Sequence, residues 1–163
     1  MEFEYSNEGN GIETPQAIID ATILKLKNFL NKDYTEHLDF GNGTFTITRG
    51  STQVMMIVRP YTERECIVEF VSNVVTGAAI THELMTFLLR KNAEMHFGTF
   101  GLLFDNTVTF SHSITGSCLN SDELKNTLNT VAFIADYYDD IIVDMSGGKR
   151  ATDLEQDFEL VEE

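Results

Sequence analysis

The stretch from Thr81 to Ser113 restricts the possible fold more than any other part of the sequence, because its hydrophobic period changes abruptly. Over 81–95 the apolar residues recur at helical spacing, which predicts a helix. From 98 onward they alternate in two short runs, 98–104 and 107–113, which indicates a β-hairpin. The residues that carry these two patterns are Leu84, Leu88 and Met95, then Phe100, Leu102, Phe104, Val108 and Phe110.

Two further helices are predicted, one on each side of this unit. Thr14 and Pro15 have the residue types of an N-cap and a first helical position, and a helix follows to about residue 33. Asn120 or Ser121 caps the last helix, which ends at Gly147-Gly148. Its apolar residues alternate at spacings of four and three, the most regular periodicity in the chain: Leu124, Leu128, Val131, Ala135, Tyr138, Ile142 and Met145.

Three strands are predicted between the first two helices, over 44–48, 52–59 and 65–75, with Gly-containing turns near them. The resulting order is α-β-β-β-α-β-β-α. We therefore expect a two-layer α+β domain in which helices pack on one antiparallel five-stranded sheet.

The net charge of −15 excludes some partners and favours others. It repels phosphate backbones and anionic membrane surfaces, so we expect no nucleic-acid and no membrane partner. A basic partner is favoured. Much of the acidity lies at the ends, so we expect flexible acidic tails over 1–13 and 149–163 around a single domain at 14–148. Two cysteines and no basic, apolar leader favour a reduced, cytoplasmic location.

Several motifs resemble those of the YbjN-like family. They are the run from Leu88 to Gly101, the turn at Asp105-Asn106, the helix start at 119–124, and Ala135-Asp136-Tyr137-Tyr138-Asp139. The resemblance covers roughly residues 14–146. That family is similar in fold to the type III secretion chaperones and shares the same element order.

The resemblance implies a peptide-binding chaperone or regulator without established chemistry. Type III chaperones are small, acidic, cytoplasmic dimers that hold an extended segment of a client protein. The resemblance therefore implies a protein or peptide client and a homodimer, with no cofactor and no catalytic residue.

The candidate binding site is an apolar sheet face. If three helices cover one face, the other face exposes part of a set of apolar residues that a monomer rarely leaves uncovered. A second subunit or a bound segment would then cover it. Two alternatives stay open: a helix wraps onto that side, or the two faces are assigned the wrong way round. The candidate residues are Phe45, Ile47, Met55, Ile57, Ile67 and Val71.

A second hypothesis is a small enzyme or a ligand- or metal-binding regulator. Its pocket would lie near His112, Cys118 and the aspartates late in the last helix, and their convergence in space would support it. Positions 136, 140 and 144 of that helix share a face, where a divalent cation or a basic partner would offset the repulsion. The aspartates are Asp136, Asp139, Asp140 and Asp144.

Overall fold

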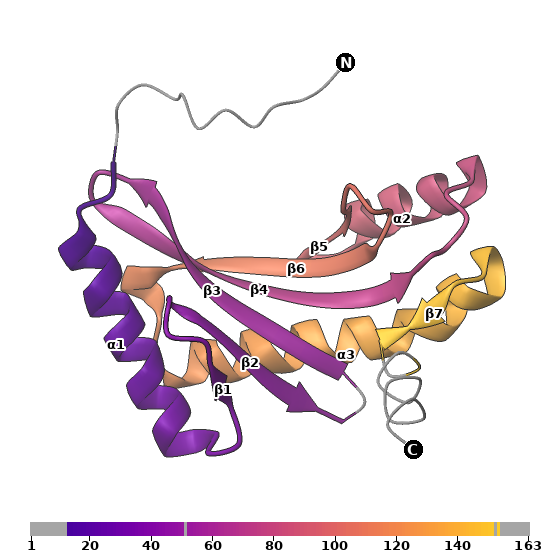
Figure 1. Ribbon diagram of the computed structural model, residues 1–163. Helices are drawn as coiled ribbons and strands as arrows, with labels where there is room; N and C mark the ends of the chain where they lie inside the picture. The colour runs from indigo at the N-terminus through magenta and orange to yellow at the C-terminus, as the bar shows by residue number, and fades with distance from the viewer. Residues whose placement is uncertain (1–12, 51, 152, 154–163) are drawn as a thin grey trace.

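The structure is a computed structural model that describes residues 13–50, 52–151 and 153 (Figure 1). It confirms the α+β class and the predicted order of the three helices and the five longer strands. The elements are α1 (Gln16–Asp33), β1 (Leu38–Asp39), β2 (Thr44–Arg49), β3 (Thr52–Thr62), β4 (Glu65–Thr76), α2 (His82–Glu94), β5 (Thr99–Leu102), β6 (Val108–Thr115), the 3₁₀ helix η1 (Gly116–Cys118), α3 (Ser121–Ser146) and β7 (Lys149–Arg150).

The sheet is antiparallel and open, with the order β1-β2-β3-β4-β6-β5 and with β7 paired to the end of β4. The part of the chain that the structure describes therefore has seven strands in this sheet, where five were predicted. The two additional strands, β1 and β7, have only two residues each, which is too short to show a periodicity in the sequence. Because the order ends on β5, one edge of β5 has no neighbouring strand within the described sheet.

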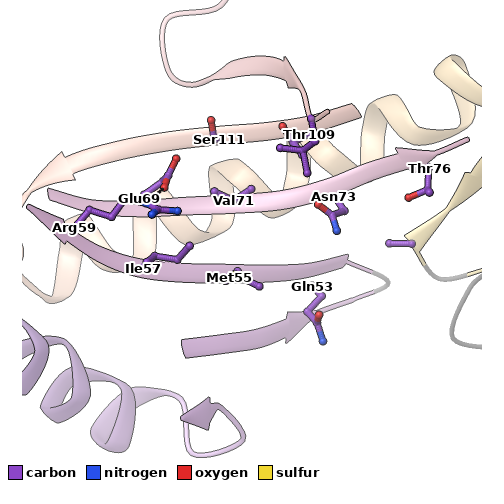
Figure 2. Close-up of a pocket in the computed structure, with 12 residues that line it drawn as sticks. Gln53, Met55, Ile57, Arg59, Glu69, Val71, Asn73, Thr76, Thr109 and Ser111 are labelled. Carbon is purple, nitrogen blue, oxygen red and sulfur yellow. Dashed lines mark hydrogen bonds and ion pairs between the residues drawn. The ribbon is translucent and has the colours of Figure 1, made fainter. Parts of the chain in front are cut away.

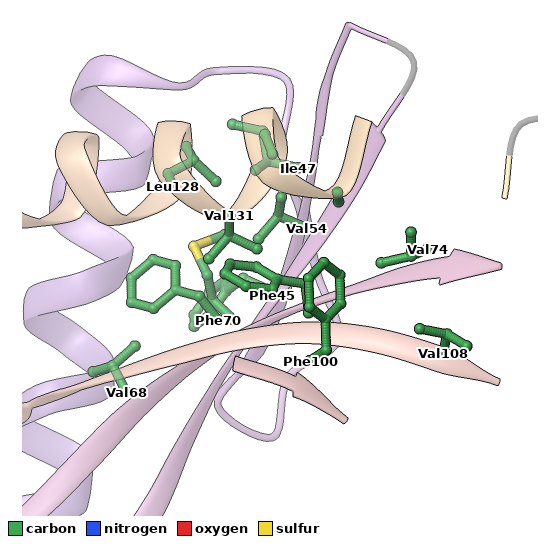
Figure 3. Close-up of a cluster of buried hydrophobic side chains, with 14 of the residues drawn as sticks. Phe45, Ile47, Val54, Val68, Phe70, Val74, Phe100, Val108, Leu128 and Val131 are labelled. Carbon is green, nitrogen blue, oxygen red and sulfur yellow. The ribbon is translucent and has the colours of Figure 1, made fainter. Parts of the chain in front are cut away.

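The hydrophobic core lies between the sheet and the helices α1 and α3, and α3 runs along the sheet (Figure 1). Phe45 and Phe70 of the sheet are fully buried in one cluster with Leu128 and Val131 of α3 (Figure 3). Phe110 of β6 is also fully buried in this core.

Helix α2 packs beside β5 at the edge of the sheet. Leu84 and Leu88 of α2 belong to the same core cluster, and the ring centroids of Phe87 on α2 and Tyr138 on α3 lie 6.1 Å apart. All three helices therefore contribute to one core.

The junction between α2 and β5 is fixed by side-chain and backbone geometry. Thr81 caps α2, with its hydroxyl accepting a hydrogen bond from the Leu84 amide at 3.1 Å. Asn92 bridges to β5: its Oδ1 accepts from the Phe100 amide at 2.7 Å and its Nδ2 donates to the Phe100 carbonyl at 3.0 Å. Gly98 has a φ of +73°, and a Cβ there would lie 2.5 Å from the Phe110 ring. Only glycine fits this position.

Two details of the predicted boundaries differ from the structure. The Thr14 hydroxyl does not cap α1; it donates to the Thr62 carbonyl at 2.6 Å and accepts from the Tyr61 amide at 2.9 Å, which fastens the helix start to the β3–β4 turn. Lys149 and Arg150, assigned to the acidic tail, instead form β7. Of the remaining tail residues, 1–12, 152 and 154–163 lie outside the described residues.

Candidate functional site

The sheet face opposite α1 and α3 carries a hollow of about 490 Å³ across β3, β4 and β6 (Figure 2). Met55, Ile57 and Val71 form its apolar centre, and Leu103 and Ala151 lie on its rim. Polar side chains surround this centre: Gln53, Arg59, Glu69, Asn73, Thr76, Thr109 and Ser111. An apolar floor with a polar frame is typical of a surface that binds a polypeptide segment. We call this surface the open face.

The strand register explains how these side chains come together. Met55 on β3 lies opposite Val71 on β4, and Ile57 lies opposite Glu69. Residues opposite one another in an antiparallel pair point to the same face. Met55 is 39% exposed while its neighbour Met56 is fully buried in the core. The same strand therefore supplies both faces.

Four of the six predicted surface residues lie on the open face and two do not. Met55, Ile57 and Val71 line the hollow, and Ile67 lies on the same face, opposite Arg59. The placement of Phe45 and Ile47 was wrong, because both are buried in the core.

The physical reason is the pairing of β2 with β3. Phe45 lies opposite Met56 and Ile47 lies opposite Val54, so both side chains point toward the helices. A period of two assigns alternate residues to opposite faces, but it does not say which face the helices cover.

The open face carries balanced charge. Two charged residues line it, and they form an ion pair in which Nε of Arg59 lies 2.6 Å from Oε2 of Glu69. The chain as a whole has a net charge of −15. The open face is therefore a neutral region on an acidic protein, where a segment of either charge can approach without like-charge repulsion from the face itself.

A second apolar surface lies between α2 and β5, and we call it the edge surface. It surrounds a hollow of about 240 Å³ lined by residues that include Leu84, Met85, Leu88 and Leu102. Leu89 of the same hollow is 69% exposed. The sequence hypothesis did not include this surface. Its signal was present, because Met85 and Leu89 widen the apolar stripe of α2 beyond the side that packs on the sheet.

The groups of the alternative site do not converge. His112 lies on β6 opposite Phe70, and its Nδ1 accepts a hydrogen bond from the Gly98 amide at 3.1 Å. Burial lowers the pKa of this imidazole. Since that ring nitrogen is already engaged, it is not free to act as a base toward Cys118, which is exposed on η1.

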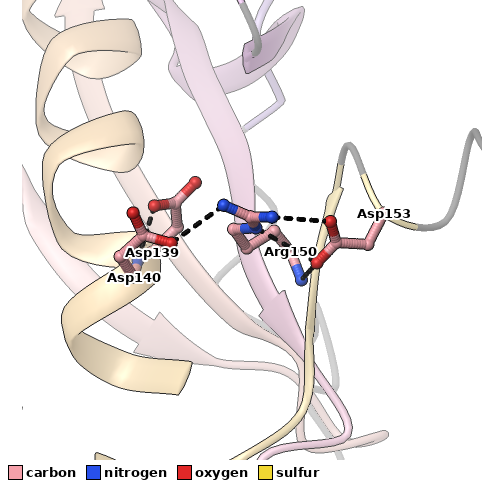
Figure 4. Close-up of polar contacts among 4 residues, drawn as sticks. All are labelled: Asp139, Asp140, Arg150 and Asp153. Atoms are coloured by element: carbon pink, nitrogen blue, oxygen red, sulfur yellow. Dashed lines mark hydrogen bonds and ion pairs between the residues drawn. The ribbon is translucent and has the colours of Figure 1, made fainter. Parts of the chain in front are cut away.

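The late aspartates lie elsewhere on α3, and one of them forms an ion pair with β7. The charge of Glu123 on α3 acts on His112, while Asp139 lies 16 residues, or about 24 Å, further along the helix. Asp140 pairs with Arg150 of β7 at 2.9 Å (Figure 4). Within residues 13–50, 52–151 and 153, no group of three or more His, Cys, Asp or Glu side chains is arranged to hold a metal ion.

Comparison with known proteins defines the class. Residues 17–154 match the family described as "T3SS (YopN, CesT) and YbjN peptide-binding chaperone 1". The match covers most of the chain, so the protein belongs to this family of peptide-binding chaperones. This confirms the resemblance drawn from the motifs of α2, β5 and α3. Among curated proteins no significant match is found.

Solved structures with a similar fold are found in complexes of two proteins, one of which is described as part of the type III secretion system. A chain of the ExsC–ExsE complex superposes with a TM-score of 0.61 at 16% identity, covering 77% of this chain and 96% of that one. The HopA1–SchA chaperone–effector complex gives 0.52 at 11% identity, covering 77% and 92%. The ExoU–SpcU complex of Pseudomonas aeruginosa gives 0.52 at 11%, covering 71% and 95%. At these identities the likeness establishes the fold.

None of the helices in the described part of the chain combines the length and apolar character needed to cross a membrane.

Proposed function

We propose that this protein is a non-catalytic, cytoplasmic chaperone that holds a segment of a client protein on its open face. The observation that carries the proposal is the hollow over β3, β4 and β6, where Met55, Ile57 and Val71 present apolar side chains on the side of the sheet away from α1 and α3. Family membership supports the same function. The three similar structures are complexes of two proteins, and one of them pairs a chaperone with an effector.

The chemistry of the open face suits an amphipathic client segment. The unbranched thioether of Met55 adapts to different apolar partners, and Ile57 and Val71 beside it add rigid apolar surface. The amides of Gln53 and Asn73 frame the floor and can bond to the polar side of a segment. The net charge of −15 favours the approach of a basic client over long distance.

A peptide library tests this function while the client is still unidentified. Peptides selected against the purified chain should carry apolar residues at amphipathic spacing. Replacing Val71 with Lys should weaken their binding at least about tenfold, because the ammonium group enters the apolar floor. The matched control is Leu24→Lys, since Leu24 is 59% exposed on α1, away from the open face. Equal binding to V71K and the wild type would reject the open face as the client site.

We also propose that the chain forms a homodimer through the edge surface. β5 lies at the end of the sheet, so its free edge can pair with the same strand of a second copy. Leu89 and Leu102 beside it are 69% and 46% exposed. Between His82 and Leu102 two acids (Glu83, Glu94) balance two bases (Arg90, Lys91), which gives a net charge of zero. Two copies can therefore meet here without the repulsion that their total charge causes elsewhere.

Sedimentation analysis tests the dimer. Leu89→Glu combined with Leu102→Glu should convert a dimer into a folded monomer, whereas Leu24→Glu should leave the dimer intact. A wild-type chain that sediments as a monomer at all concentrations, or a dimer that survives the double substitution, would contradict the proposal.

A further inference from the structure

The described chain ends on the rim of the open face, in a position that several contacts fix. β7 pairs with the end of β4, Arg150 opposite Val75, and Ala151 lines the hollow. The Arg150 guanidinium bonds to Asp140 and Asp153, each at 2.9 Å (Figure 4). The turn before β7 requires glycine at position 148, since Gly148 has a φ of +94° and a Cβ there would lie 2.7 Å from the Thr76 carbonyl oxygen. This turn directs the chain onto the end of β4.

The ten residues that follow, 154–163, have a hydrophobic pattern that predicts packing against an apolar surface. Three of their four apolar residues recur at spacings of four and three, so on a helix these three would form one stripe, with Leu160 beside it. A helix of this length does not persist alone in water and needs a surface to pack against. The stripe consists of Leu154, Phe158 and Val161; the acidic residues between and beside them are Glu155, Asp157, Glu159, Glu162 and Glu163.

The distances allow this segment to reach the floor of the hollow. Ten residues span about 15 Å as a helix and about 33 Å when extended. From Thr76, where β7 pairs, to Val71 is five residues of strand, or about 16 Å. The extended segment therefore covers the distance to Val71 and to Met55 opposite it, and the helical segment matches that distance to within about one residue. Arg59 and Glu69, the charged residues that line the hollow, neutralise each other, so the face does not repel an acidic segment.

We propose that residues 154–163 dock on the open face of their own chain, with Leu154, Phe158 and Val161 over Met55 and Val71. The segment is then a resident occupant of the surface. The regulatory consequence rests on the proposed function. A client must displace the segment, so the protein's apparent affinity for the client falls in proportion to the fraction of molecules in which the open face is free.

Methyl NMR on the full chain, labelled at the methionine methyl groups, tests the docking. Phe158→Ala should move the Met55 resonance, because the ring of Phe158 lies over it. The chemical shift of Met56 should not change, since Met56 is buried on the opposite face of the sheet and reports only on the core. Two matched controls should leave Met55 unmoved: Gln156→Ala within the segment, and Phe133→Ala, an exposed ring on α3.

A chain that stops after Asp153 provides the second variant, with Met56 as the check that its core is intact. It should reproduce the Met55 shift of F158A, and a synthetic peptide of residues 153–163 should restore the original position. The same peptide with Phe158→Ala and Val161→Ala should not. The proposal would be overturned if neither F158A nor the truncation changed the chemical shift of Met55. Two other results would overturn it as well. A change at Met85 of α2 instead would place the segment on the edge surface. A change that depends on protein concentration would place it on a second copy of the chain.

The two proposals fail in different ways. If library peptides bind the open face with equal affinity in the full and the shortened chain, the open face is still the client site, but the docking of residues 154–163 is rejected. If Met55 responds to F158A but no library peptide binds even the shortened chain, the segment stands and the client site is rejected. If both hold, the shortened chain should bind the selected peptides several-fold more tightly than the full chain.

Discussion

The two faces of the β3–β4 pair use the same kinds of residue and have different roles. On one face Met56 and Phe70 lie opposite each other, fully buried beneath α3. On the other face, one residue along each strand, Met55 and Val71 lie opposite each other in the hollow. The difference does not come from composition, since both pairs are apolar. It comes from α1 and α3, which pack on only one side.

This contrast shows what apolar residues on an uncovered face are for. On the core face each apolar side chain stabilises the fold by burial, roughly 1.5–3 kcal/mol for a large one. On the open face the corresponding groups remain partly in water, so part of this stabilisation is still available to whatever covers them. Substitutions at neighbouring positions should therefore separate folding from binding.

The largest effect is expected at the centre of the core. Phe70→Ala should lower the free energy of unfolding by about 3–5 kcal/mol, because it removes a fully buried ring and leaves a cavity. Its neighbour gives the comparison: Val71→Ala should cost about 1 kcal/mol or less. Urea denaturation measures both. Similar losses at the two positions would mean that the open face is packed like the core.

A second, smaller loss is expected where α2 joins β5. Asn92→Ala should cost about 1–3 kcal/mol, because it leaves the amide and the carbonyl of Phe100 without their partners. The control is Asn73→Ala on the open face, where the side chain is exposed and the cost should stay within about 0.5 kcal/mol. If N92A were as mild as N73A, the Asn92 bridge would contribute nothing to the edge of the sheet.

The sequence predicted those elements whose signals are local. Asn120 was one of the two residues expected to cap the last helix, and its side chain accepts hydrogen bonds from the amides of the following turn. The change of period at Gly98 predicted the α2–β5 junction, and glycine is required there. Each of these depends on residues close together in the chain, so the pattern contains the information.

The missing parts depend on contacts that are distant in sequence. Phe45 and Ile47 alternate as expected, but only the packing of α1 and α3 decides that their side chains point inward. β7 exists because Lys149 and Arg150 meet the end of β4, more than 70 residues away, and because Arg150 meets Asp140. Thr14 has the residue type of a cap, yet the β3–β4 turn takes its hydroxyl.

A third prediction concerns pH. Burial lowers the pKa of His112 below the ordinary value of 6.5, and protonating Nδ1 would break the hydrogen bond from Gly98. The unfolded chain then binds the proton more tightly, so stability should fall as the pH drops from about 6.5 toward the lowered pKa and be constant above this window. The slope of the unfolding free energy against pH must stay below about 1.4 kcal/mol per pH unit, the limit for one proton.

Urea denaturation at several pH values measures this slope, and His112→Gln should remove the part of the slope that His112 contributes. An unchanged slope would contradict the assignment.

The smallest expected effect sharpens the comparison most. In the chain that stops after Asp153, Met55→Gln should change the free energy of unfolding by no more than about 0.5 kcal/mol, because an amide on a water-exposed face loses nothing. In the full chain the same substitution should cost more if residues 154–163 pack on Met55. The difference between the two costs is a double-mutant cycle, and groups in direct contact give coupling energies of about 0.5 kcal/mol or more. Met56→Gln provides the control, since it buries an amide in the core and should be equally damaging with and without the segment. A coupling energy of zero at Met55 would mean that the open face is bare in the isolated chain and stays apolar only for a partner.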